Sequence, residues 1–261
     1  MEFSNEVELL DNERIDDLQL NGLRIIQKRE GFCFGIDAVL LANFADVRKK
    51  DKVIDLGTGT GIIPILLSGK TQAASITGIE IQPDMAEMAS RSVRLNGLEE
   101  RVSIICMDLR KSVEYFGASK FNVVISNPPY INQGCGLVNP SDTKAISRHE
   151  IMCSLEDIIN TASRLLVPGG QFAMVHRPYR LVDIMYHMRN YSLEPKYLRF
   201  VHPSAGKKPN LLLIKGIKGG RPELKMMDPL YIYDENGKYT RDIDLIYGRI
   251  TVMELKINED K

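Results

Sequence analysis

Three acidic residues lie at or near the ends of successive apolar stretches. Asp55 follows the apolar residues of "KVIDLG", Glu80 lies in "SITGIEI", and Asp108 ends "VSIICMD". Each stretch is typical of a buried strand, and the carboxyl ends of parallel strands meet along one edge of a sheet. A carboxylate there can accept hydrogen bonds from both ribose hydroxyls, and another can accept one from an adenine amine. The three acids together favour a nucleoside-binding site.

A glycine-rich turn follows the first of these stretches. "GTGTG" places Gly57, Gly59 and Gly61 at alternate positions, just where a helix is expected to begin. Glycine can adopt positive φ and lets the backbone approach a ligand closely. The dinucleotide pattern G-x-G-x-x-G is not matched, because Ile62 occupies its third glycine position, and no Gly-Lys-Ser/Thr of a phosphate-binding loop follows. The turn therefore predicts a ligand site without a diphosphate cradle.

A rigid corner ends a fourth apolar stretch. "FNVVISNPPY" begins at residue 121 and leads into Asn127, Pro128, Pro129 and Tyr130. Neither proline has a backbone N–H for a sheet ladder, so the strand must end here. The two rings also fix the direction of the Pro128 carbonyl. The corner thus presents a side-chain amide, a fixed carbonyl and an aromatic ring near the acids.

The segments that carry these residues alternate between strand and helix signals. Helices are expected at 61–70, 82–98, 155–166 and 179–190, and strands at 52–57, 75–81, 102–108, 121–127, 171–177, 195–203 and 210–218. Such alternation implies right-handed crossovers and a sheet covered by helices on both faces. We therefore predict an α/β fold with a doubly wound, mostly parallel seven-stranded sheet. The last two strands should pair antiparallel across "SAGKK" and give one antiparallel edge strand.

The composition is that of a globular protein. Of the 261 residues, 26% are charged and 44% are hydrophobic. No apolar run reaches the length of about 18 residues that a membrane helix needs. The acidic N-terminus shows no secretory signal. The cysteines form no CxxC pair and have no ligand spacing with the four histidines. We expect free thiols in a reducing cytoplasm and no metal site. The cysteines are Cys33, Cys106, Cys135 and Cys153.

The net charge is zero, but it is unevenly distributed. Residues 171–225 contain 11 Lys and Arg against 3 Asp and Glu, a local charge of +8. A charge run usually means a solvated face, yet an excess of this size favours a polyanionic partner. Lys207 and Lys208 lie in a connection that should project from the edge of the sheet.

The motifs as a set resemble a known family. "VIDLGTGTG", Glu80, Asp108 and "NPPY" are similar to the class I S-adenosylmethionine-dependent methyltransferases over roughly residues 34 to 215. The resemblance implies a Rossmann-like fold with S-adenosylmethionine as cofactor. It places Asp55 and the three loop glycines at the methionine part, Glu80 at the ribose and Asp108 at the adenine. "FGIDAVLLA" (34–42) resembles the segment before the fold in amino-methylating members, which places Asp37 near the cofactor.

The rigid corner has a chemical use in such an enzyme. The lone pair of an adenine or carboxamide nitrogen is delocalised, so the nitrogen is a poor nucleophile. The Asn127 side-chain oxygen and the Pro128 carbonyl can accept from its two N–H groups and aim the lone pair at the methyl group. Asn127 then lies beside the cofactor as well. Tyr130 can stack on a planar substrate. We expect Asn127, Pro128 and Tyr130 to be the catalytic residues, with positioning and fixed dipoles in place of a general base.

Two groups of enzymes share this corner. The methyltransferases that modify a glutamine of peptide release factors usually carry a helical domain before the cofactor fold, whereas about 50 residues precede Lys52 here. "SRHE" (147–150) and "DPLYIYDENGKYTRDIDLIYG" (228–248) are similar to the bacterial tRNA adenine-N6 methyltransferases. We therefore predict methylation of the exocyclic amine of a tRNA adenine near the anticodon. The alternatives are release-factor glutamine-N5 methylation and a non-catalytic cofactor-binding RNA protein.

The chain is expected to have three parts. An N-terminal arm and cofactor-covering segment (1–50) precede the methyltransferase domain (51–225), and a C-terminal appendage (226–261) follows. Lys207 and Lys208 should bind tRNA, together with Arg148 and His149 in the loop after the corner, although these last two could equally anchor that loop. We favour a cytoplasmic monomer.

Overall fold

The computed structural model describes residues 7–30, 35–130 and 153–250. Nine strands of these ranges form the central sheet, in the spatial order β10-β8-β9-β7-β6-β3-β4-β5, and β11 pairs with β8 as well. The strands are β3 (Lys52–Leu56), β4 (Ser75–Glu80), β5 (Val102–Cys106), β6 (Phe121–Ser126), β7 (Leu166–His176), β8 (Leu193–Ser204), β9 (Leu211–Lys218), β10 (Lys225–Met226) and β11 (Leu230–Tyr233).

Pairing in this sheet is mainly parallel. β3 lies between β4 and β6 and is parallel to both, β4 is parallel to β5, and β6 is parallel to β7. β9 alone runs against its neighbours β7 and β8. The structure therefore confirms the α/β fold, the mostly parallel sheet and the antiparallel pairing across residues 204–208.

Two details of the sheet differ from the expectation. The antiparallel strand β9 lies between β7 and β8 and is not at the edge, and the sheet has nine strands where seven were expected. The extra strands are β10 and β11, both of which pair in parallel with β8. Without them β8 would be a 12-residue edge strand with a row of unpaired backbone groups. The short C-terminal strands cover that edge.

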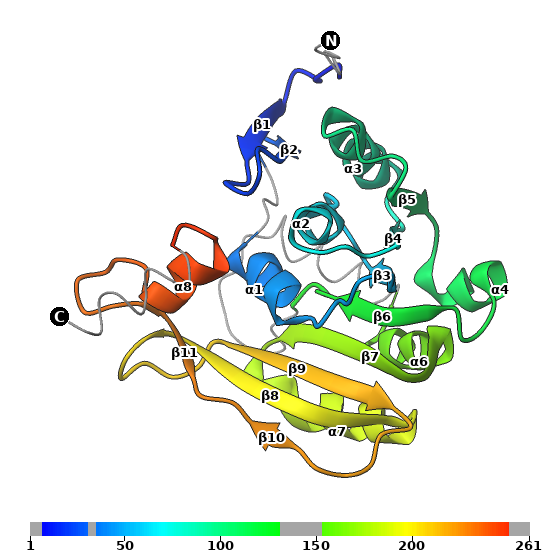
Figure 1. Cartoon of the computed structure of the whole chain (residues 1–261), viewed down its shortest axis with the longest axis vertical. Coiled ribbons are helices and arrows are strands. Elements are labelled where there is room, and N and C mark those ends of the chain that lie inside the picture. Colours follow the sequence, from blue (N-terminus) through cyan, green and yellow to red (C-terminus); the bar gives the residue numbers. More distant parts are fainter. Residues whose placement is uncertain (1–6, 31–34, 131–152, 251–261) are drawn as a thin grey trace.

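Helices cover both faces of the sheet, as Figure 1 shows. One face carries α1 (Ile36–Phe44), α2 (Ile62–Lys70), α3 (Pro83–Leu95) and α8 (Arg241–Ile246), and the other carries α4 (Ser112–Phe116), α6 (Leu155–Leu165) and α7 (Leu181–Asn190). Neighbouring strand residues alternate between the two cores: Val53 packs with α1 and α2, and Ile54 packs with α6 and α7. No helix in the described ranges is long and apolar enough to cross a bilayer.

An N-terminal hairpin packs beside α3. It consists of β1 (Glu13–Asp17) and β2 (Arg24–Lys28), paired antiparallel. The backbone N–H of Ile26 donates to the Ser92 hydroxyl of α3 at 3.0 Å. The Arg91 guanidinium binds both oxygens of the Glu13 carboxylate, at 2.6 and 2.7 Å, and both side chains are buried. The hairpin is thus fixed to α3 by a buried ion pair as well as by apolar contact.

Candidate active site

The glycine turn connects β3 to α2 at the carboxyl edge of the sheet. Gly57, Gly59 and Gly61 have φ of +79°, +56° and +80°. A side chain would be strained at each position, because L-residues rarely adopt this region. A Cβ atom on Gly57 or Gly59 would meet nothing within 4 Å, whereas on Gly61 it would lie 3.1 Å from the Ala89 Cβ of α3. The first two glycines therefore leave open space for a ligand, and the third allows the helices to pack.

Glu80 ties this turn to the end of β4. Its carboxylate accepts the N–H of Gly59 on one oxygen and the N–H of Gln82 on the other, both at 2.9 Å. The Gln82 side-chain amide also donates to this second oxygen, Oε1, at 3.4 Å, so Oε2 is the oxygen with a lone pair left for a ligand hydroxyl. Glu80 is buried, which holds its direction fixed.

Asp55 is a buried carboxylate beside the same turn. Neither of its oxygens has a hydrogen-bond partner among the described residues, and the nearby Thr58 hydroxyl also has none. Burial raises the pKa of Asp55 to about 7. Buried polar groups without partners are rare and costly, so they mark places where a ligand or water completes the bonding. The Asp55 carboxylate and the Thr58 hydroxyl therefore supply an acceptor and a donor at the base of the glycine turn.

Asp108 follows β5 and forms local bonds that the sequence did not reveal. It accepts the N–H of Arg110 at 2.9 Å at the start of a one-turn helix (Leu109–Lys111), and the Arg110 guanidinium binds its carboxylate. The Arg110 guanidinium holds the pKa of Asp108 below its usual value. Asp108 is therefore an ionised acceptor that already has a cationic partner.

The rigid corner at the end of β6 meets the start of α1. The Tyr130 hydroxyl lies 2.9 Å from the Asn127 Oδ1 and 2.9 Å from the Asp37 Oδ2. The other Asp37 oxygen accepts the N–H of Ala38 at 2.9 Å, in the first turn of α1. Tyr130 of the corner therefore contacts Asp37, which the sequence had placed near the cofactor but had not linked to the corner.

Comparisons with known proteins point to one family. The model of the family described as "Methyltransferase small domain" matches residues 35–188. The chain belongs to this family. A relative from Porphyromonas gingivalis is 32% identical over 185 residues, which cover 69% of this chain and 72% of the relative. A relative from Phocaeicola vulgatus is 28% identical over 180 residues, 69% of this chain and 74% of the relative. Both are named tRNA1(Val) (adenine(37)-N6)-methyltransferase.

Solved structures agree on the methyltransferase fold. A protein described as a predicted O-methyltransferase, from Agrobacterium tumefaciens, has a TM-score of 0.67 at 25% identity and covers 81% of this chain and 95% of its own. An O-methyltransferase from Thermotoga maritima has a TM-score of 0.52 at 18% identity, with 75% of this chain and 69% of its own covered. The expected class I methyltransferase fold is thus confirmed.

The methyl donor of the methyltransferase is S-adenosylmethionine. The residues present fit it. The Asp55 oxygens are buried without partners, Glu80 Oε2 has a spare acceptor site, and the turn at Gly57 and Gly59 leaves room for close approach. When bound, the donor supplies a sulfonium-activated methyl group, and the residues of the chain hold and orient it.

Two residues that the sequence did not assign to the active site surround the Tyr130 ring. They are His176, the last residue of β7, and Arg177, which follows it. The Arg177 guanidinium lies 4.6 Å from the Tyr130 ring centroid, and the His176 ring is edge-on at 5.4 Å. Burial lowers the pKa of His176 to about 4, so its imidazole is neutral at pH 7. The available signal was positional, since "QFAMVHR" ends at the same sheet edge as the other site strands.

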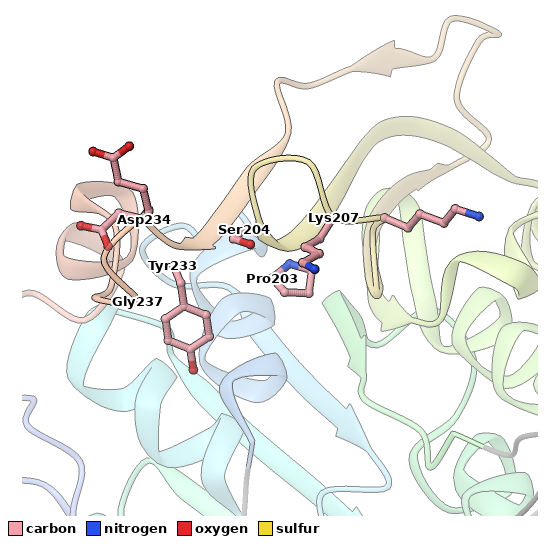
Figure 2. Close-up of a pocket in the computed structure, with 8 residues that line it drawn as sticks. Pro203, Ser204, Lys207, Tyr233, Asp234 and Gly237 are labelled. Carbon is pink, nitrogen blue, oxygen red and sulfur yellow. The ribbon is translucent and has the colours of Figure 1, made fainter.

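Lys207 and Lys208 line an open groove of about 620 Å³ between the β8–β9 connection and the β11 segment. Figure 2 shows Tyr233 and Asp234 on one side of this groove and Pro203 with Lys207 on the other. The Arg177 guanidinium donates to the Asn210 carbonyl at 3.0 Å, just before β9 begins. Arg177 therefore joins the surroundings of Tyr130 to the β8–β9 connection, which lines the groove.

Part of the positive charge counted for residues 171–225 is buried or paired with acidic residues. Lys215 is buried against Asp46 at 2.7 Å, and Lys218 donates to the Leu166 carbonyl at 2.7 Å. Arg180 and Arg189 pair with Asp183 and Glu194. Lys207 and Lys208 are exposed, and neither has an ion pair within the described residues.

The remaining expectations concern the loop after the corner, metal ligands and the cysteines. Arg148 and His149 lie outside the described residues. Within the described ranges, no cluster of three or more His, Cys, Asp or Glu side chains could hold a metal ion. Cys106 and Cys153 are free thiols.

Proposed function

We propose that this methyltransferase transfers a methyl group from S-adenosylmethionine to the exocyclic N6 amine of an adenine in tRNA, near the anticodon. The relatives from Porphyromonas gingivalis and Phocaeicola vulgatus carry names for this activity, and the chain covers 72% and 74% of their lengths. The reaction belongs in the cytoplasm, where the tRNA substrate is found.

The observation that carries the proposal is the corner at the end of β6. Asn127 and Pro128 provide a side-chain acceptor and a backbone acceptor on adjacent residues, next to the carboxyl end of β3 with its glycine turn. Two acceptors match the two N–H groups of an adenine amine and turn its lone pair toward the methyl group. The nitrogen–carbon bond forms as the sulfur–carbon bond breaks, and the amine proton leaves to solvent. Fixed dipoles stabilise the charge that develops on nitrogen.

The cofactor contacts follow the same edge of the sheet. We assign Asp55 and the glycine turn to the methionine part of S-adenosylmethionine, because both provide polar backbone and side-chain groups at the end of β3. We assign Glu80 to the ribose, since its Oε2 has a spare lone pair, and Asp108 to the adenine amine. Asp37 and Asn127 lie beside this site on the side of α1, where both are 2.9 Å from the Tyr130 hydroxyl.

Lys207 and Lys208 are our proposed contacts to tRNA phosphates. They lie on the β8–β9 connection at the same edge as the corner, because Leu212 at the start of β9 pairs with His176 at the end of β7. The nearby Tyr231 and Tyr233 are partly exposed, and unpaired bases of an RNA loop can stack on such rings. An adenine in a loop is also cheaper to unstack than one in a duplex.

Nucleoside mass spectrometry of the substrate tests the proposal. Unmodified tRNA incubated with the protein and S-adenosylmethionine should gain N6-methyladenosine at a single position in the anticodon loop. Asn127→Ala, which removes the side-chain acceptor, serves as the matched inactive protein. If the tRNA gains no methyl group while a release-factor glutamine does, the acceptor is a protein carboxamide and the adenine assignment is wrong.

A further inference from the structure

The Tyr130 hydroxyl has no task in the proposed reaction, because stacking on a substrate needs only the ring. The structure nevertheless gives it two close neighbours. It lies 2.9 Å from the Asp37 Oδ2 and 2.9 Å from the Asn127 Oδ1. A phenol has one proton, and both neighbours are acceptors in this arrangement, so the hydroxyl can donate to only one of them.

The chemistry of the two acceptors decides where the proton lies. Burial, with the neighbouring Asp37 carboxylate, raises the pKa of Tyr130 well above its ordinary value, so the hydroxyl keeps its proton at neutral pH. A carboxylate is a stronger acceptor than a neutral amide oxygen, by roughly a factor of two in bond strength. Tyr130 therefore donates to Asp37 and turns the lone pairs of its oxygen toward Asn127.

The direction of the Tyr130 hydroxyl proton affects the Asn127 amide. One end of the amide accepts hydrogen bonds and the other end donates them. In the structure the amide oxygen faces the Tyr130 oxygen at 2.9 Å, and once Tyr130 donates to Asp37 these two acceptors would repel each other. A half-turn of the amide replaces this contact by an N–H···O bond, because the two ends have nearly the same size. The amide oxygen then points away from Tyr130 and is available to the substrate amine.

We propose that Asp37 and Tyr130 form a positioning pair that sets which end of the Asn127 amide faces the acceptor amine. The inference rests on the proposed role of Asn127 and deepens it. Both members are held in place by other bonds. Asp37 accepts the N–H of Ala38 in α1, and Arg177 covers the Tyr130 ring at 4.6 Å. Asp37 thus acts on the chemistry through Tyr130, not by touching the substrate.

The test is a double-mutant cycle measured on the full chain with tRNA. Tyr130→Phe keeps the ring and removes the hydroxyl, so kcat should fall about tenfold or more, the factor expected for a lost hydrogen bond. The KM for tRNA and the Kd for S-adenosylmethionine should stay within about twofold. Asp37→Ala should lower kcat by a similar factor. The double variant should be no slower than the slower single variant, because both changes break one chain of bonds.

Two further variants test whether the lost rate comes from the bond between Tyr130 and Asp37. Asp37→Asn retains an oxygen that can accept from Tyr130, so part of the lost rate should return. Tyr191→Phe is the matched control, because Tyr191, which follows α7, also donates to a carboxylate, Glu156 of α6, at 2.6 Å. That variant should have wild-type kcat and KM.

Three results would overturn the positioning pair. They are wild-type kcat in Tyr130→Phe, additive losses in the double variant, and a loss of cofactor affinity in Asp37→Ala, which would place Asp37 on the cofactor itself. Asn127→Ala separates this inference from the proposed function. A wild-type rate in that variant removes the amide from the chemistry altogether, whereas a wild-type rate in Tyr130→Phe alone removes only its positioning.

Discussion

The backbone N–H of Gly59 donates to the Glu80 carboxylate at 2.9 Å, so the acid that ends β4 holds the glycine turn that follows β3. The second Glu80 oxygen accepts from Gln82, where α3 is about to begin. One buried side chain therefore fixes two neighbouring loops at the carboxyl edge of the sheet.

Glu80→Ala should weaken binding of S-adenosylmethionine by about 1.5–3 kcal/mol, because charge-assisted bonds to the ribose and the support of the turn are both lost. Isothermal titration calorimetry measures this directly. Glu99→Ala, which removes an exposed acid from the α3–β5 connection, should bind as the wild type does. Unchanged affinity in Glu80→Ala would remove Glu80 from the site.

The cofactor-free protein should lose stability as the pH rises through the range in which Asp55 ionises. Its pKa is about 7 in the folded chain against an ordinary 3.8. Between these values the folded state keeps a proton that the unfolded chain has lost, so the free energy of unfolding falls with rising pH. Urea denaturation at pH 5 and pH 7.5 should show a smaller fall in Asp55→Asn than in the wild type. The exposed Asp11→Asn serves as control, and equal falls in all three proteins would contradict the prediction.

Asn127→Ala should separate chemistry from binding. Removing an acceptor that matters most in the transition state should lower kcat by about 10²–10³-fold, as removal of other fixed polar groups does. Affinity for S-adenosylmethionine should change far less. Single-turnover methylation and calorimetry on the same protein give the two quantities, and a parallel loss in both would make Asn127 a cofactor ligand first.

Lys207→Ala combined with Lys208→Ala should weaken tRNA binding and flatten its salt dependence by about 1–2 units of log–log slope, because two phosphate contacts no longer release counterions. Cofactor affinity should be unchanged. Lys49→Ala with Lys120→Ala removes the same charge from exposed positions before β3 and β6 and should keep the wild-type slope. If both double variants behave alike, the effect is one of net charge and not of a binding face.

Arg91→Ala should destabilise the chain by about 3–5 kcal/mol, since it leaves the Glu13 carboxylate buried without its partner. Arg91 holds the pKa of Glu13 below its ordinary value in the folded state. That contribution is present above the ordinary pKa of 4.5 and is lost as the pH falls below it. Chemical denaturation at pH 7 and pH 3.5 should therefore show the wild type and Arg91→Ala converging at the lower pH.

Much of the active-site edge was determined by local sequence. β3 and β6 are short apolar runs that are soon followed by Gly57 and by Pro128. Glycine permits backbone conformations that other residues avoid and proline fixes φ, and neither property depends on distant contacts. Parallel strands in alternation with helices bring their carboxyl ends to one edge. The fold class, the glycine turn and the rigid corner could therefore be predicted from the sequence.

The tertiary structure decided the contacts between residues that are far apart in the chain. Tyr130 meets Asp37 over a separation of 93 residues, and Arg91 meets Glu13 over 78. The ion pair between Lys215 and Asp46 also joins residues far apart in the chain, and so does the pairing of β10 and β11 with β8. A charge or a short strand has no intrinsic partner, because its neighbours are set by how the sheet and helices pack. Only the folded chain could therefore show that a tyrosine hydroxyl joins an acid of α1 to the amide at the end of β6.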